Sequence, residues 1–186
     1  MCAYGRLVPR PLRPQIAGGV YHLMSRGNRR SVIFRDDRDH VLFVSIFLGV
    51  VARFGWELHG WCLMTTHYHL LLTTVDPNLA RGMQRLNSLY AEAFNDRYAL
   101  SGHVFQGRYG HVVINDDDHL ARAYRYIARN PVRAGICRRP EEWPWSGYTG
   151  LALGWEGQAY RSPALVEHFG RRGGVRALRA FVDAPR

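Results

Sequence analysis

A pair of adjoining strand-like segments, with a helical segment on either side, is the feature that most constrains how this chain folds. Residues 56–64 and 67–74 are rich in apolar and aromatic residues, and only Thr65-Thr66 separates them, which predicts an antiparallel hairpin. The helix after it is expected to begin at Asp76-Pro77, where a cap residue precedes proline at the first helical position. One apolar stripe recurs along that helix at steps of four, three, four and four: Leu79, Met83, Leu86, Tyr90 and Phe94.

Aspartates mark the starts of two further helices. Asp36 precedes a helix expected over about residues 39–53, where a carboxylate suits the positive end of the helix dipole. The run Asp116–Asp118 caps a third helix over about residues 119–130, which Pro131 terminates. Both helices therefore have a start signal in the local sequence.

The predicted elements follow an order that is typical of one topology. That order is strand, helix, strand, strand, helix, strand, helix, with the first strand over residues 20–24 and the fourth strand or hairpin over residues 103–115. The first six elements match the ferredoxin-like βαββαβ arrangement, an α+β fold in which two helices cover one face of an antiparallel sheet and leave the other face for a ligand. We predict a single domain over residues 1–186, made of an extended arm (1–19), a core (20–135) and a C-terminal appendage (136–186).

The charge of the chain favours a polyanionic partner. The net charge is +10, and all 25 basic residues are Arg, whose planar guanidinium meets phosphate oxygens through paired hydrogen bonds. A GC-rich genome also favours Arg over Lys, but that bias does not account for the excess of positive charge. Nucleic acid is therefore the partner class that the composition indicates.

Neither the cysteines nor the apolar segments indicate a secreted or membrane protein. Cys2, Cys62 and Cys137 are odd in number and far apart, unlike a disulfide framework or a zinc knuckle. The longest apolar run, residues 41–51, is shorter than the roughly 20 residues that span a bilayer. We expect a cytoplasmic location and no contact with a membrane.

Two histidines, His67 and His69, lie at the start of the second hairpin strand. Side chains alternate along a strand, so both imidazoles project from one face while Tyr68 points to the other. Residues two apart are separated by roughly 7 Å, which lets the two rings converge on one divalent ion. An isolated pair of this kind is more often two satisfied polar groups, so the doublet needs support from elsewhere in the chain.

The third helix provides that support, because one of its tyrosines falls away from the packing face. Leu120, Tyr124 and Ile127 form the apolar stripe, and Tyr126 lies about 200° around the helix from Tyr124, on the face shared with Asn130. A phenol attacks a phosphodiester only with help, and a cation that polarises the phosphate provides it. Two imidazoles and the Asn130 carbonyl oxygen would suit Mn²⁺ or Mg²⁺, although Asn130 is equally placed to cap the helix end.

Five short blocks occur along the chain in one order. They are Tyr21–Arg29 (YHLMSRGNR), Met64–Leu71 (MTTHYHLL), Gly102–Tyr109 (GHVFQGRY), Tyr126–Gly135 (YIARNPVRAG) and the turn Trp143–Ser146 (WPWS). Together they resemble the blocks of REP-associated tyrosine transposases and their relatives among the single-tyrosine transposases of the HUH nuclease superfamily. The resemblance covers about residues 10–150.

The resemblance implies an activity and a set of site residues. His67 and His69 match the metal ligands, Asn130 matches the position of a polar third ligand, and Tyr126 matches the nucleophile that becomes joined to a 5′ phosphate and leaves a free 3′ hydroxyl. A transposase of this kind uses Mg²⁺ or Mn²⁺ and cuts and rejoins single-stranded DNA, often at hairpin-forming repeats. We expect a monomer or weak homodimer, since both monomeric and dimeric relatives exist.

Two basic loops beside the blocks are candidates for contacting DNA phosphates or a hairpin. The first follows the first strand, and the second contains a glycine that lets a backbone approach closely; their residues are Arg26, Asn28, Arg29 and Arg30 in the first and Arg108 in the second. The chain departs from the family at Thr65-Thr66, where relatives usually have Pro-Asn. Some relatives also continue with a further DNA-binding region, which leaves target selection open.

Three other functions fit parts of this pattern. A non-enzymatic RNA-binding module would present aromatic residues on an open sheet, which leaves the pairing of His67 and His69 with a helical tyrosine unexplained. A metal-dependent hydrolase that uses water would cleave DNA without a protein adduct. A transposase that has lost its activity would only bind hairpins, although the intact His67, His69, Tyr126 and Asn130 favour retained chemistry.

Overall fold

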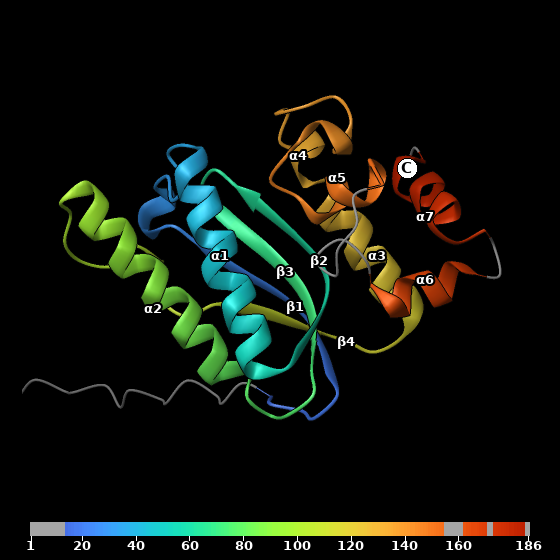
Figure 1. Cartoon of the computed structure of the whole chain (residues 1–186), viewed down its shortest axis with the longest axis horizontal. Coiled ribbons are helices and arrows are strands. Elements are labelled where there is room, and N and C mark those ends of the chain that lie inside the picture. The colour runs from blue at the N-terminus through green and yellow to red at the C-terminus, as the bar shows by residue number, and fades with distance from the viewer. Residues whose placement is uncertain (1–13, 155–161, 171–172, 185–186) are drawn as a thin grey trace, which may run out of the picture.

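A four-stranded antiparallel sheet forms the centre of the computed structural model, which describes residues 14–154, 162–170 and 173–184 (Figure 1). The strand order is β2-β3-β1-β4. The strands are β1 (Gly19–Arg26), β2 (Trp56–Met64), β3 (His67–Thr74) and β4 (Gly110–Ile114). This order and the alternation with helices are the expected α+β ferredoxin-like arrangement.

Two long helices, α1 (Asp37–Phe54) and α2 (Leu79–Tyr98), lie on one side of the sheet (Figure 1). Asp36 caps α1, because its carboxylate accepts a hydrogen bond from the backbone N–H of Asp39. Gly55 ends the helix with a φ of 63°, a left-handed conformation that glycine adopts without strain. The expected stripe of α2 is buried at every position: Leu79, Met83, Leu86, Tyr90 and Phe94.

The start of α2 corrects the sequence prediction. The helix begins at Leu79 and not at Pro77, with Asn78 in the cap position. The Asn78 side chain does not cap the helix; its Oδ1 accepts from Trp56 Nε1 at 2.7 Å, and its Nδ2 donates to the Phe54 carbonyl at 2.9 Å. Tertiary hydrogen bonds to the end of α1 and the start of β2 therefore set this boundary.

The fourth strand is shorter than expected. Only residues 110–114 pair with β1, whereas residues 103–109 form a loop that contacts Gly27 through an isolated bridge at Phe105. This loop packs beside the end of β1, since Asn28 N–H donates to the Val104 carbonyl at 2.8 Å. This loop, which contains most of the third sequence block, therefore lies next to the first basic loop.

Side-chain alternation along the central strands separates two buried clusters. Tyr21 and Leu23 of β1 pack with Tyr68 and Leu70 of β3 in the cluster under α1 and α2. Leu71 points the other way, into a second cluster that includes the apolar side of the third helix. The histidines of these strands share this second face of the sheet, as the period of two requires.

The third helix, α3 (Asp117–Ala128), lies on that second side, and the C-terminal helices gather around it (Figure 1). It ends before residue 130, and Pro131 does not terminate it but lies in the first turn of a separate short helix. The remaining helical elements are the 3₁₀ turns η1 (Asn28–Arg30) and η2 (Pro140–Glu142), α4 (Asn130–Arg133), α5 (Gly147–Ala152), α6 (Pro163–Gly170) and α7 (Gly174–Asp183).

Two tryptophans attach the segment after α4 to the rest of the chain. Trp143 Nε1 donates to the Leu63 carbonyl at 2.9 Å, and the Trp145 ring stacks on His40 with centroids 4.5 Å apart. Of the expected arm, residues 1–13 lie outside the described residues. Within the described ranges, no helix is long and apolar enough to cross a membrane.

Candidate active site

A cleft of about 630 Å³ opens between α3 and the sheet. It contains two of the residues singled out in the sequence, His69 and Tyr126, together with three more histidines and an arginine. Its lining residues are His22, Met24, His69, Gly110, His111, Val112, His119, Arg122, Ala123 and Tyr126.

His69 lies at the floor of this cleft and is only 2% exposed. Its Nδ1 is 2.9 Å from Nε2 of His22, a neighbour on β1. Its Nε2 is buried and has no hydrogen-bond partner among the described residues. Buried polar atoms nearly always have a partner, so a free ring nitrogen here is suited to binding a ligand atom or a cation.

His67 stands next to His69 on the same face of β3. The two ring centroids are 5.1 Å apart and the rings are nearly perpendicular, at 86°. His67 Nδ1 lies 3.2 Å from the Thr66 hydroxyl, which leaves its Nε2 for another ligand. The two imidazoles are therefore closer than the roughly 7 Å spacing of alternate residues along a strand.

The electrostatic environment keeps these imidazoles neutral. Burial, with a smaller contribution from the neighbouring Arg26 charge, lowers the pKa of His67 to about 4. Burial also lowers the pKa of His22 to about 4, with a smaller contribution from His119, and it lowers the pKa of His69 well below 6.5. Neutral imidazole is the form that binds metal ions.

Tyr126 faces the histidines from α3. Its ring centroid is 5.7 Å from that of His69, with the rings at 90°, and 5.8 Å from that of His22. The Tyr126 side chain is 40% exposed, whereas Tyr124 is buried in the core at 4%. The guanidinium of Arg133 lies 5.3 Å from the Tyr126 ring centroid, so a cation as well as the imidazoles of His69 and His22 lies close to the phenol.

A glycine in β2 lets α3 approach the sheet at this place. A Cβ at Gly60 would lie 2.8 Å from Cδ2 of Tyr124, closer than carbon atoms normally pack. The Tyr124 ring occupies the space that a side chain at position 60 would fill. Gly60 therefore fixes how near α3, and with it Tyr126, lies to β3.

Asn130 is not among the residues that line the cleft. It begins α4, and Arg129 rather than Asn130 occupies the cap position of α3. The Asn130 Nδ2 is buried without a partner among the described residues. Because amide nitrogen and oxygen are assigned from their contacts and are otherwise interchangeable, the same position suits a carbonyl oxygen directed at a ligand.

The first basic loop lies beside the two histidines of β3. Arg26, which is half-buried, pairs in register with His67 across β1 and β3, and its Nε is buried without a partner within the described ranges. Gly27 N–H donates to the Thr66 carbonyl at 2.8 Å, which holds the loop against the turn before His67. Its other candidates for DNA contact, Asn28, Arg29 and Arg30, are exposed.

Arg108 lies elsewhere. It lines two clefts that Asn87 and Ser88 of α2 also line, on the side of the sheet away from Tyr126. The structure thus brings His67, His69, Tyr126 and Arg26 together but leaves Arg108 apart from them.

Sequence reasoning did not place His22 next to His69. Two facts determine the position of His22. Tyr21 and Leu23 face the buried cluster under α1 and α2, so His22 lies on the opposite face of the sheet. β1 also pairs with β3 in a register that places Met24 opposite His69. The alternation of side chains could be predicted from the sequence, but the register between β1 and β3, which are distant in the sequence, could not.

The described residues contain no group of three or more His, Cys, Asp or Glu side chains that could hold a metal ion. The donors that lie side by side are the neutral imidazoles of His67 and His69, and Nε2 of His69 has no partner among the described residues. A set of this kind leaves coordination positions for oxygens of a substrate. The residues present therefore fit a divalent cation that is shared with a phosphate.

The chain was compared with known proteins. A family model described as "Transposase IS200 like" matches residues 16–130, which include both histidines of β3, Tyr126 and Asn130. A Haemophilus influenzae protein assigned as a REP-associated tyrosine transposase is 29% identical over 118 residues, which are 57% of this chain and 66% of that protein, slightly less than two thirds of its length.

The fold of the chain also matches that of a solved structure. It is described as a REP-associated tyrosine transposase bound to a REP hairpin, and it superimposes with a TM-score of 0.66 over 84% of this chain and 93% of its own, at 19% identity. At this level of identity the likeness shows that the two proteins share a fold.

Proposed function

The chain belongs to the IS200-like transposase family, and on that premise we propose that it cuts and rejoins single-stranded DNA through Tyr126. One observation carries the proposal: the unpartnered, buried Nε2 of His69 lies beside an exposed tyrosine whose ring centroid is 5.7 Å from that of His69. A core tyrosine would be buried, and most buried polar side-chain atoms have a hydrogen-bond partner.

His67 and His69 would hold a Mg²⁺ or Mn²⁺ ion through their Nε2 atoms, and Asn130 is the candidate for a third ligand. Bound there, the ion would polarise the scissile phosphate and neutralise charge that develops on its oxygens. His22 acts as a positioning residue, because its contact with Nδ1 of His69 at 2.9 Å fixes the ring and leaves Nε2 for the ion.

Tyr126 supplies the nucleophile. Its phenolic oxygen attacks the phosphorus, a bond forms between that oxygen and the 5′ phosphate, and the bond from phosphorus to the 3′ oxygen breaks. The departing 3′ oxygen takes up a proton as the phenol gives one up. Because the tyrosine ester retains the energy of the broken linkage, the 3′ hydroxyl of another strand rejoins the DNA by the reverse attack without ATP.

Basic residues near the site suit the charge of the substrate. Arg26 lies next to His67, Arg122 lines the cleft and Arg133 stands near the Tyr126 ring. Guanidinium groups bind phosphate oxygens through paired hydrogen bonds. We propose hairpin-forming repeats as the substrate, in keeping with the REP hairpin named for the solved structure, and a monomer or weak homodimer as the acting form.

The test uses the full chain, labelled single-stranded DNA that carries hairpins from the repeats flanking its gene, and Mn²⁺ or Mg²⁺. We expect a covalent protein–DNA band on a denaturing gel that a chelator abolishes. Tyr126→Phe should remove the band, whereas Tyr124→Phe, a change two residues away in the core, should retain it. Cleavage without a band would favour a hydrolase, and binding without cleavage would indicate a hairpin-binding protein whose site residues are relics.

A further inference from the structure

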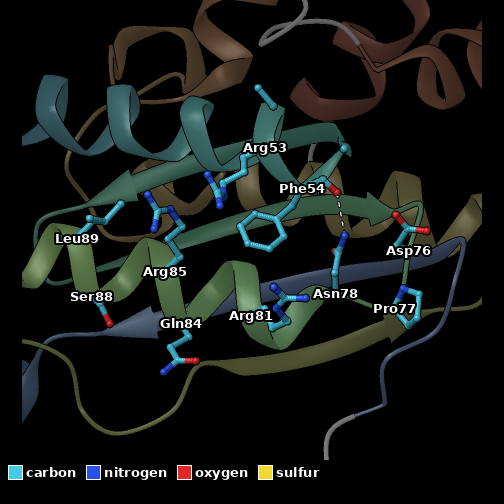
Figure 2. A pocket seen from close by; sticks show the side chains of 12 residues that line it. Arg53, Phe54, Asp76, Pro77, Asn78, Arg81, Gln84, Arg85, Ser88 and Leu89 are labelled. Carbon is cyan, nitrogen blue, oxygen red and sulfur yellow. Dashed lines mark hydrogen bonds between the residues drawn. The ribbon is translucent and has the colours of Figure 1, made fainter.

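A second charged cleft lies on the opposite side of the sheet from His69 and Tyr126. It runs between the end of α1 and the first turns of α2 and has a volume of about 1070 Å³ (Figure 2). We call it the α1–α2 groove and define it by Arg53, Phe54, Asn78, Arg81, Arg85 and Ser88. Its location away from α3 means that the cleavage chemistry does not use it.

Three arginines line the α1–α2 groove, and Asp76 is the one carboxylate among its described lining residues. Arg53, Arg81 and Arg85 are all exposed, and none forms an ion pair or a side-chain hydrogen bond within the described residues. Arg81 and Arg85 are one helical turn apart, where like charges repel. The first turn of α2 also contains no acidic residue, although a helix start favours negative charge.

The walls of the groove are held in place before any ligand binds. The Asn78 side chain donates to the Phe54 carbonyl at 2.9 Å, shown as a dashed line in Figure 2, and accepts from Trp56 Nε1 at 2.7 Å. These bonds join the end of α1 to the start of α2. Figure 2 shows Arg53 and Arg85 directed into the same space from the two helices. Such preorganisation lowers the cost of binding.

We propose that the α1–α2 groove binds the phosphodiester backbone of DNA outside the cleavage site. The rise between Arg81 and Arg85 is about 6 Å along the helix axis, and phosphates of one strand advance by about 3.4 Å per nucleotide, so the two guanidiniums reach different phosphates of one strand. The groove offers charge and no deep apolar pocket, which fits a backbone contact that carries no sequence information.

A path connects the groove to the edge of the sheet. Gln84 and Ser88 of α2 line both the α1–α2 groove and the neighbouring cleft that contains Arg108. Arg108, which lies apart from the candidate active site, therefore extends the basic surface of the groove around α2. DNA that occupies both sides of the sheet must pass around its edge, so a short strand fills the active-site cleft without reaching the groove.

This inference rests on the proposed function, which supplies DNA as the ligand. Binding is therefore measured without metal, so that the groove is tested separately from the cleavage reaction. The probe is a labelled DNA hairpin with single-stranded tails, read by fluorescence anisotropy over a range of salt concentrations. The test variant is Arg53→Gln, Arg81→Gln and Arg85→Gln together. The control carries the same loss of charge at exposed arginines elsewhere: Arg38→Gln, Arg176→Gln and Arg179→Gln.

Each phosphate contact on duplex DNA contributes about 0.9 to the slope of log affinity against log salt. Loss of three contacts should lower that slope by about 2.7, so the advantage of the wild type over the groove variant should shrink by about 40-fold between about 50 and 200 mM salt. A single strand of about six nucleotides should show no such difference. Equal slopes for the groove and control variants would overturn the proposal. The proposal would also be overturned if free inorganic phosphate alone weakened DNA binding and the binding did not depend on the length of the DNA.

The proposed function and this inference fail in different ways. A hairpin that binds through the groove but is never cut would overturn only the nuclease. Cleavage at Tyr126 with identical salt slopes would overturn only the groove. Circular dichroism of both triple variants shows whether either has lost its fold, and exposed arginines at all six positions make intact folding the expected result.

Discussion

Gly60→Ala should reduce the rate of DNA cleavage without touching any residue that contacts DNA. The added Cβ would lie 2.8 Å from Cδ2 and 3.0 Å from Cε2 of Tyr124. An ordinary carbon contact is 3.4 to 4 Å, so the ring must withdraw by about 0.6 to 1.2 Å. Tyr124 is 4% exposed and packed in the core, which leaves movement of α3 as the response.

The size of the effect follows from the position of Tyr126, two residues along the same helix. A displacement of about 1 Å between reacting groups costs on the order of 10²-fold in rate. Overpacking of a core costs about 1–3 kcal/mol of unfolding free energy. We therefore expect a cleavage rate lowered by about 100-fold in a protein that is still folded at low temperature.

The assay compares initial rates of covalent adduct formation with stability from urea unfolding. Gly49→Ala is the matched control, because no atom lies within 4 Å of its added Cβ and alanine in a helix stabilises by about 0.4–1 kcal/mol. A Gly60→Ala protein with the wild-type rate would refute the argument that this glycine sets the distance between α3 and β3. So would a rate loss that unfolding alone explains.

Two further predictions concern the histidine pair and acid stability. His22→Phe should weaken Mn²⁺ binding by about 10–100-fold in calorimetric titration, since outer-shell partners of ligating histidines have effects of this size. The control is His103→Gln, a change at an exposed histidine outside the cleft, which should leave Mn²⁺ binding unchanged. An equal loss of Mn²⁺ affinity in both variants would contradict the prediction. Hydrogen bonds from Arg97 lower the pKa of Asp36 from 3.8 to about 2, so the stability from this pair is present above pH 3.8 and is lost as the pH falls through about 2. Wild type should therefore be more stable than Arg97→Gln in urea near pH 5, and the difference should diminish toward pH 2; a difference that stays constant with pH would show that Asp36 is not the group involved.

The two hairpin strands were predictable because their signals are local. Residues 56–64 and 67–74 became β2 and β3 with the expected bounds, since both segments are apolar and only a two-residue turn separates them. The stripe of α2 was equally readable from its period. The start of α2 was not, because Asn78 uses its side chain to bond Trp56 and Phe54, contacts that no local pattern encodes.

The candidate site likewise has features that the local sequence predicted and features that it did not. Alternation placed His67 and His69 on one face, and the helical period separated Tyr126 from the buried Tyr124. The contact of His22 with His69 depends on the register of β1 against β3, and the groove of Arg53 with Arg85 depends on how α1 packs on α2. Both arise from pairing of segments distant in the sequence, so they became visible only in the fold.

The most direct test of the central claim is to locate the covalent bond to DNA by mass spectrometry. Trypsin cleaves after Arg125 and Arg129, so it separates Tyr126 from Tyr124 into different peptides. After reaction with DNA and Mn²⁺, we predict a nucleotide joined through its 5′ phosphate to the peptide of residues 126–129, with the other DNA fragment released carrying a free 3′ hydroxyl. An adduct on any other residue, or DNA that is cut while this peptide keeps its unmodified mass, would contradict the account.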